Sequence, residues 1–264
     1  MWWFLLLPFC FCLIYCLLIV QYRKWFVKLS LFKAELSAQY THFSIIIPAR
    51  NEEENIEACL QSIFQNNYPS NRFEVLVIDD FSSDRTVEQI KHLQKKHSNL
   101  RLFLLQDLLG DNNINSYKKK AIELAIGKAA GDWIITTDAD CVVPQQWLFL
   151  FNAYINQNKP VFIAAPVSFI QQHTFVSRFQ SLDFMSLQGI TAASVAAGFH
   201  SMCNGANLAY EKSAFYKVNG FAGIDNIASG DDMLLMHKIA QQFPNGIGSL
   251  FHQNAIVQTQ PVDS

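Results

Sequence analysis

The chain has 264 residues, a formal net charge of −2 and 50% hydrophobic residues. This length allows one large domain or two small ones. The 20 basic and 22 acidic residues nearly balance, so the chain lacks the basic excess of a nucleic-acid-binding protein, and we expect no nucleic-acid partner. The six cysteines show no Cys-x-x-Cys spacing, which argues against a zinc site and agrees with a reducing compartment.

The N-terminal segment is apolar and uncharged. Residues 2–20 would form about 28 Å of helix, which matches the hydrocarbon thickness of a bilayer. Arg23, Lys24 and Lys28 follow this segment, and no charged side chain precedes it. By the positive-inside rule we expect residues 1–22 to anchor the chain in a membrane, with the remainder in the cytoplasm. The alternative, a cleaved signal peptide, normally has a basic start and a small-residue cleavage site, which this segment lacks.

Beyond a connector at residues 23–42, short apolar runs alternate with helical patterns. Strands are predicted at residues 43–48, 73–79, 100–105 and 133–138. Helices are predicted after an N-cap at Asn51, after residues 82–84 and over residues 121–130. This alternation indicates right-handed βαβ crossovers and an α/β fold with a mainly parallel sheet. Ligands of such sheets bind at the carboxyl ends of the strands.

Polar residues follow three of the predicted strands. Residues 48–51 follow the first strand, Asp79 and Asp80 end the second, and Asp138 and Asp140 end the fourth. Residues two apart in a strand point to the same side, so we expect the last two carboxylates to face one point. Carboxylates suit Mg²⁺ or Mn²⁺, which often completes its shell with substrate phosphates. The alternative is that one of these two Asp residues caps a helix and the other is solvated.

The chain has neither a Gly-x-Gly-x-x-Gly motif nor a P-loop, which argues against a dinucleotide dehydrogenase or a P-loop enzyme. Four motifs occur instead. They are Ile-Ile-Ile-Pro-Ala-Arg-Asn-Glu at residues 45–52, Val-Ile-Asp-Asp-Phe-Ser-Ser-Asp-Arg-Thr at 77–86, a Lys-rich helix start at 118–120 and Thr-Asp-Ala-Asp at 137–140. Their order and spacing resemble the GT-A fold glycosyltransferases of family 2, the inverting enzymes that include cellulose, chitin and hyaluronan synthases. The resemblance runs from about residue 43 to residue 257.

The resemblance implies how a UDP-sugar donor is bound. The first loop, with Pro48, Ala49, Arg50 and Glu52, would flank the uracil and ribose. Asp79 or Asp80, of which Asp80 is favoured, would accept a hydrogen bond from the uracil N3–H, a donor that cytosine lacks.

The resemblance also implies residues for the diphosphate and a metal ion. Lys118 would approach the diphosphate, although Tyr117 replaces the glycine usual before this lysine. Asp140 would ligate Mg²⁺ or Mn²⁺, and Asp138 would lie beside it, contacting the metal, the ribose or the sugar. The ion would neutralise the leaving diphosphate.

On the acceptor side, Asn204 and Gly205 match the segment that borders the donor sugar and the acceptor. Residues 229–235 resemble the family's Thr-Glu-Asp motif, whose Asp removes the proton of the attacking hydroxyl. Alignment on Leu235 makes Asp232 this base, whereas a shift by one residue makes it Asp231. We favour Asp232.

The chain departs from the family pattern at its C-terminus. Membrane-bound members continue with a Gln-x-x-Arg-Trp segment and further transmembrane helices, whereas this sequence ends at residue 264. We therefore expect a GT-A domain at residues 43–264 that is incomplete at its C-terminus, with a nucleotide-binding half at 43–142 and an acceptor half at 143–264. The alternative is a protein that lacks the usual acceptor gate.

The expected function is that of an inverting hexosyltransferase in a bacterial inner membrane, which transfers a sugar from UDP to a lipid or glycan acceptor. One alternative is a nucleotidyltransferase that makes NDP-sugars, but such an enzyme usually has a Gly-rich first loop. Another is a non-catalytic membrane partner with a degenerate site. The intact Asp80, Asp138, Asp140 and Asp232 argue against it.

Overall fold

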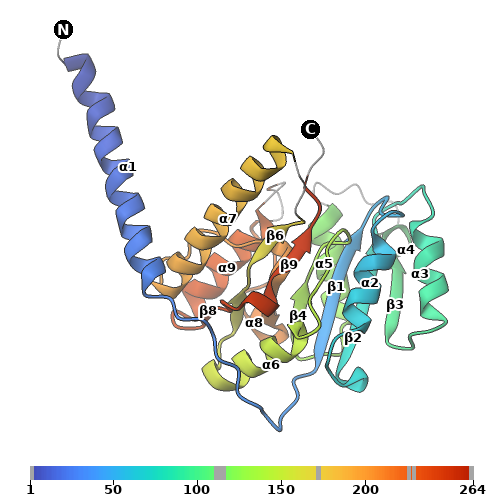
Figure 1. Ribbon diagram of the computed structural model, residues 1–264. Helices are drawn as coiled ribbons and strands as arrows, with labels where there is room; N and C mark the ends of the chain where they lie inside the picture. Colours follow the sequence, from blue (N-terminus) through green and yellow to red (C-terminus); the bar gives the residue numbers. More distant parts are fainter. Residues whose placement is uncertain (1–2, 110–116, 171–173, 225–226, 228–229, 262–264) are drawn as a thin grey trace.

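The computed structural model describes residues 3–109, 117–170, 174–224, 227 and 230–261. Within this part of the chain, a central sheet has the strand order β3-β2-β1-β4-β7-β5-β8, and β6 pairs with β9 beside it (Figure 1). The strands are β1 (Phe43–Ala49), β2 (Phe73–Asp79), β3 (Leu100–Leu104), β4 (Trp133–Thr136), β5 (Phe162–Ala164), β6 (Val167–Phe169), β7 (Leu208–Glu211), β8 (Ile247–Ser249) and β9 (Val257–Thr259). The helices are α1 (Trp3–Val27), α2 (Ile56–Phe64), α3 (Thr86–Gln94), α4 (Leu105–Leu109), α5 (Tyr117–Lys128), α6 (Trp147–Asn158), α7 (Phe175–Ala196), α8 (Lys212–Lys217) and α9 (Asp231–Gln242).

The sheet is mainly parallel, as the alternating sequence predicts. Strands β3, β2, β1 and β4 run in one direction, and β7 lies antiparallel between β4 and β5. Alternate side chains of the central strands enter two hydrophobic clusters, one on each face of the sheet. Ile45 and Val75 pack with α2, α3 and α6, whereas Ile46 and Leu76 pack with α5 and α9. Burial on both faces explains why these strands are continuous apolar runs.

Two predicted boundaries are wrong in a way that concerns the site. Strand β4 ends at Thr136, so Asp138 and Asp140 lie on the turn that follows and not on the strand itself. Asn51 does not cap a helix, because α2 begins only at Ile56. Asn51 instead has φ of 54°, and its side-chain oxygen accepts a hydrogen bond from the backbone N–H of Ser83 at 2.8 Å. The sequence shows polar turn formers here, but it does not show that this loop is tied to the next βα loop.

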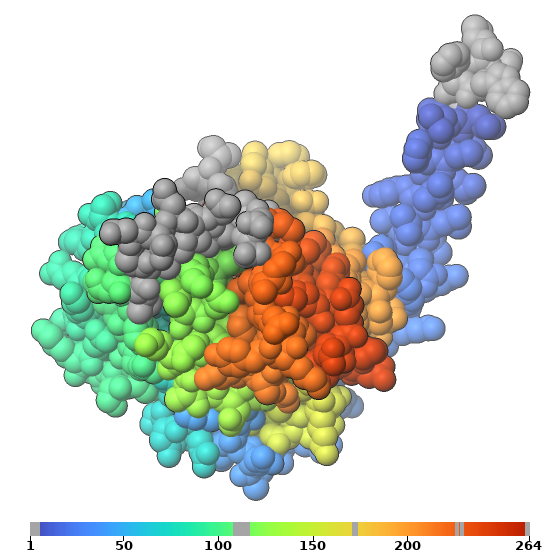
Figure 2. Space-filling view, turned by 180° about the vertical axis from the view of Figure 1, so that it is seen from behind, coloured from blue at the N-terminus to red at the C-terminus, as the bar shows by residue number. Residues whose placement is uncertain are grey.

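Helix α1 projects from the domain (Figures 1 and 2). Residues Leu6–Val27 have a mean hydropathy of 1.8 and none of the span is buried, so the helix is long and apolar enough to cross a membrane. The C-terminal end of α1 contacts the domain: Trp25 packs on Phe199 with ring centroids 6.0 Å apart, and Phe26 packs on Phe251 at 5.9 Å. Residues 1–2, at the start of the predicted anchor, and 262–264, at the end of the predicted domain, lie outside the described residues.

Candidate active site

A pocket lies at the carboxyl edge of the sheet, where β1 and β4 end. Its wall contains six of the residues that the sequence singles out, which come from β1, α5, the turn after β4, the segment before β7 and α9. They are Pro48, Lys118, Asp138, Gly205, Asp231 and Asp232. These residues are far apart in the chain. The sheet brings them together, because β1 and β4 end at this edge and the antiparallel strand β7 begins there.

Lys118 and Asp138 form an ion pair in this wall. The Lys118 Nζ lies 2.8 Å from Asp138 Oδ1. Burial lowers the pKa of Lys118, but the carboxylates of Asp138, Asp231 and Asp232 outweigh burial and raise it. The first turn of α5 therefore places a charged ammonium group among the carboxylates of the pocket.

Asp140 lies at the other end of the same turn, and a different part of the chain holds it. Its Oδ2 accepts a 2.6 Å hydrogen bond from Thr259 Oγ1, and the Cys141 thiol lies 3.6 Å from its Oδ1. Glu52 is close to both acidic residues of the turn. Burial raises the pKa of Glu52, a hydrogen bond from Asn55 lowers it, and Asp140 and Asp138 add to the increase. The Glu52 carboxylate therefore interacts electrostatically with the two carboxylates of this turn.

The described residues contain no group of three or more His, Cys, Asp or Glu side chains arranged to enclose a metal ion. Asp138 lines the pocket, and Asp140 follows two residues later in the same turn, so this turn supplies two carboxylates. Hard oxygen donors fit Mg²⁺ or Mn²⁺, and an incomplete protein shell fits an ion that takes its other ligands from substrate phosphates and water.

The end of β2 carries two carboxylates with unused acceptor atoms. Asp79 Oδ2 accepts a hydrogen bond from the backbone N–H of Ser82 at 3.2 Å, and Asp80 lies 3.8 Å from Arg50. The other oxygen of each side chain, Oδ1, is buried and has no partner among the described residues. Burial raises the pKa of Asp80; Arg50 opposes the increase and Asp79 adds to it. Buried acceptors without a donor are rare in proteins, so these two oxygens are suited to a donor from a ligand.

Asp231 and Asp232 are the first two residues of α9, where the positive end of the helix dipole favours acidic side chains. Asp232 lies against Gly205: a Cβ added to this glycine would be 3.6 Å from Asp232 Oδ2. Burial raises the pKa of Asp232, hydrogen bonds from the Met233 and Gly205 backbone oppose it, and Asp231 adds to the increase. Asp232 is therefore a better proton acceptor than an ordinary aspartate.

Two asparagines near Gly205 differ in what they do. Asn204 accepts a hydrogen bond from the Ala206 N–H at 2.9 Å and so caps a short 3₁₀ turn, Gly205–Asn207. Asn207 is fully buried, and its side chain bonds Trp147 Nε1 at 2.9 Å and two backbone oxygens at 2.7 and 2.8 Å. Sequence reasoning did not single out Asn207, because its partners Trp147, Pro166 and Ala255 are distant in sequence and no local pattern indicates them.

The predicted residues outside the pocket wall are nearby but have other surroundings. Ala49 is buried at the end of β1, and its carbonyl accepts the Asp80 N–H at 2.8 Å. Arg50 is exposed. Sequence reasoning also missed Thr259, because a threonine in a short strand gives no local sign that it contacts Asp140.

Comparisons with known proteins show which family the chain resembles. The family model described as "Glycosyl transferase family 2" matches residues 44–218. Glycosyltransferase AglE of Haloferax volcanii is 35% identical over 105 residues, which are 40% of this chain and 32% of that protein. Poly-beta-1,6-N-acetyl-D-glucosamine synthase of Staphylococcus epidermidis is 26% identical over 198 residues, which are 74% of this chain and 45% of that protein. The chain thus spans less than half the length of these relatives.

Solved structures show the same fold. The mannosyltransferase PcManGT of Pyrobaculum calidifontis, in complex with GDP-Man and Mn²⁺, has a TM-score of 0.67 at 20% identity, covering 94% of this chain and 65% of that one. Residues 1–349 of Staphylococcus aureus TarS, in complex with UDP-GlcNAc, have a TM-score of 0.61 at 19% identity, covering 84% of this chain and 59% of that one. The mainly parallel sheet with its edge pocket is a GT-A fold, and the chain belongs to glycosyl transferase family 2.

Proposed function

We propose that the protein transfers a hexose from a UDP-sugar to a hydroxyl group of a lipid or glycan acceptor, with inversion at the anomeric carbon. The observation that carries the proposal is the convergence of Lys118, Asp138, Asp231 and Asp232 on one pocket at the carboxyl edge of the sheet. This is the edge at which α/β proteins bind their ligands. The relatives named above, whose printed names describe glycosyltransferases and a polysaccharide synthase, support the same reaction class.

The donor nucleotide binds at the ends of β1 and β2 in this proposal. The buried Oδ1 atoms of Asp79 and Asp80 accept no hydrogen bond from any described residue, and the uracil N3–H can donate one. We assign this contact to Asp80, while Pro48, Ala49, Arg50 and Glu52 border the nucleoside. A guanine base also has a ring N–H donor, so the nucleotide must be tested by direct comparison of UDP with GDP.

The diphosphate lies between Lys118 and the turn after β4. The Lys118 ammonium group provides a positive charge at the pocket wall, where it already pairs with Asp138. Asp140 and Asp138 would hold a Mg²⁺ or Mn²⁺ ion. When bound, this ion neutralises the negative charge that builds up on the leaving UDP.

The acceptor is activated by Asp232, with Asp231 as the alternative base. The carboxylate removes the proton of the acceptor hydroxyl as its oxygen attacks the anomeric carbon, and the bond from that carbon to UDP breaks. A pKa raised by burial matches this task, because a base is most effective when its pKa approaches the working pH. Gly205 lines the neighbouring wall, where the small glycine leaves room for the sugar ring, and Asn204 caps the short turn that begins at this glycine.

Residues 1–22 form a membrane anchor in this proposal, with residues 43–142 as the nucleotide-binding half and 143–264 as the acceptor half of a cytoplasmic domain. The support is the length and hydropathy of α1, together with the basic residues that follow its apolar part. An anchor would keep the pocket close to a lipid-linked or membrane-extruded acceptor.

Calorimetry on the full chain tests the donor site. UDP should bind at least tenfold more tightly with Mn²⁺ than without it and more tightly than GDP, and Asp140→Ala should remove the gain from Mn²⁺. The matched control is Asp107→Ala, which replaces an exposed acidic residue on α4. This variant should bind UDP and Mn²⁺ as the original chain does. Equal UDP affinity with and without metal, or an Asp140→Ala variant that keeps the gain, contradicts the proposal.

A further inference from the structure

Strand β9 is attached to the turn that carries Asp138 and Asp140. Gln258 and Val142 form a two-way bridge, with N···O distances of 2.7 and 2.9 Å. On the other side, the Thr259 carbonyl accepts the Ile170 N–H at 2.9 Å, next to the β6–β9 pairing. The backbone around Thr259 is therefore held from two directions.

The side chain of Thr259 uses this fixed backbone to reach Asp140. Side chains two apart in a strand share a face, so Thr259 lies on the side of the fully buried Val257, opposite to the exposed Gln258. Its Oγ1 donates to Asp140 Oδ2 at 2.6 Å, a distance typical of a hydroxyl bonded to a charged carboxylate. A β-branched residue has few χ1 choices, so a held backbone also orients the hydroxyl.

We propose that Thr259 is a positioning residue for Asp140. The Thr259 hydroxyl group orients the Asp140 carboxylate for binding a divalent cation. The inference rests on the proposed function, because it takes Asp140 as a metal ligand. Oδ2 keeps a further lone pair. In the described part of the chain, Oδ1 accepts only from the weak thiol donor of Cys141, so the Thr259 hydroxyl leaves acceptor capacity for an ion.

The physical role is that of an outer partner of a metal ligand. A carboxylate on a turn can rotate, and each orientation that does not face the ion reduces the affinity for it. A hydrogen bond from a rigid neighbouring element removes part of this freedom, and loss of such partners typically weakens metal binding by about 10–100-fold. The contact also links the last described strand, 119 residues away in sequence, to the metal-binding turn.

Three variants of the full chain test the proposal. Thr259→Val keeps the shape and the strand preference but removes the hydroxyl; Thr259→Ser keeps the hydroxyl. Gln258→Val, on the opposite face of the same strand, controls for effects on β9 itself. Free Mn²⁺ is measured by electron paramagnetic resonance during titration in the presence of UDP, and UDP binding is measured separately without metal.

We expect Thr259→Val to weaken Mn²⁺ binding about tenfold, with metal-free UDP binding unchanged, and Thr259→Ser and Gln258→Val to stay within about twofold of the original chain. Thr259→Val with unchanged Mn²⁺ affinity overturns the positioning role and leaves the proposed function intact. A loss shared equally by Gln258→Val also overturns it, since the effect would then belong to the strand. If the original chain binds no Mn²⁺ in the presence of UDP, the proposed function is wrong. This inference is then wrong as well, because it depends on that function.

Discussion

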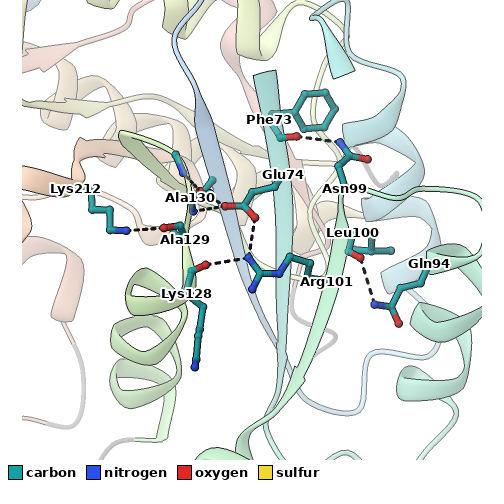
Figure 3. A network of polar contacts seen from close by, with 12 residues as sticks. Phe73, Glu74, Gln94, Asn99, Leu100, Arg101, Lys128, Ala129, Ala130 and Lys212 are labelled. Carbon is teal, nitrogen blue, oxygen red and sulfur yellow. Dashed lines mark hydrogen bonds and ion pairs between the residues drawn. The ribbon is translucent and has the colours of Figure 1, made fainter. Parts of the chain in front are cut away.

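The two ends of strand β2 use buried carboxylates in opposite ways. At the amino end, Glu74 is surrounded by donors (Figure 3): its Oε1 accepts Ser44 Oγ at 2.7 Å and the Ala130 N–H at 2.5 Å, and its Oε2 accepts Arg101 Nη1 at 3.0 Å. At the carboxyl end, Asp79 and Asp80 each keep a buried oxygen without a partner among the described residues.

The pKa shifts follow the same division. Burial raises the pKa of Glu74, but the hydrogen bonds from Ser44, Ala130 and Arg101 more than offset it, so the pKa is lowered overall. For Asp80, burial raises the pKa and Arg50 offsets it only in part. The amino end thus stabilises the fold with satisfied charges, whereas the carboxyl end has unsatisfied acceptors, which bind the donor nucleotide in the proposed function. Substitutions at one end should therefore reduce stability, and substitutions at the other should reduce function.

The largest effect is expected at Asp232. Asp232→Asn removes the proposed base and should lower kcat by about 10³-fold, or ~4 kcal/mol, with UDP affinity within about twofold of the original chain. The rate is measured as the release of UDP from a UDP-sugar, in membranes that contain the acceptor. Activity should also rise with pH through the raised pKa of Asp232, because the base must be deprotonated.

Asp231→Asn is the matched control, since it changes the neighbouring residue of the same helix turn. It should cost less than tenfold in kcat. If Asp231→Asn is the more damaging of the two, Asp231 is the base, and the alignment shifted by one residue is correct.

The next effect is expected at Lys118. Lys118→Met keeps the length of the side chain but removes the charge that faces the pocket, and should weaken UDP binding with Mn²⁺ by about 100-fold, or ~2.7 kcal/mol. Lys120→Met on the same helix is the control, because Lys120 pairs with Glu123 at 2.7 Å and does not line the pocket. If calorimetry gives equal UDP affinities for the two variants, Lys118 does not contribute to the donor site.

The fold and several residues of the pocket wall were predictable from the sequence, because both depend on local patterns. Apolar runs that end in polar residues marked β1, β2 and β4 to within two residues, and the family motifs identified the pocket wall. The family match also speaks against a nucleotidyltransferase. Proposed roles such as the uracil contact of Asp80 stay predictions, as do the membrane topology and the incomplete C-terminus.

What could not be predicted depends on contacts between distant residues. Whether Asp140 bonds Thr259, or Glu74 bonds Arg101, is decided by which strands become neighbours, and no local pattern shows it. The same holds for Lys119, one of three consecutive lysines. Its buried side chain donates to the carbonyls of Ile224 and Ile227, before α9.

At the amino end, Glu74→Gln should destabilise the fold by about 2 kcal/mol, because an amide cannot accept from all three donors. A lowered pKa in the folded state adds stability above the unfolded pKa, and this stability is lost as the pH falls through the folded pKa. The difference from the original chain should therefore shrink in acid. Urea denaturation measures the difference, with the more exposed Glu123→Gln as control at less than about 0.5 kcal/mol. A large loss of UDP affinity in folded Glu74→Gln would contradict the division between the two ends.

The smallest effect should have the opposite sign. Asp80→Asn keeps the shape of the side chain and removes a buried charge whose pKa is raised by burial. Such a group contributes stability below its unfolded pKa and loses it as the pH rises through the folded pKa. The neutral variant should therefore be about 1 kcal/mol more stable near pH 7 and no more stable near pH 3.

The same change should weaken UDP binding about tenfold, since the amide is a poorer acceptor for the uracil N–H. Urea denaturation at both pH values measures the first effect and calorimetry the second, with the exposed Asp132→Asn as control. A variant that loses both stability and UDP affinity would mean that Asp80, like Glu74, serves the fold.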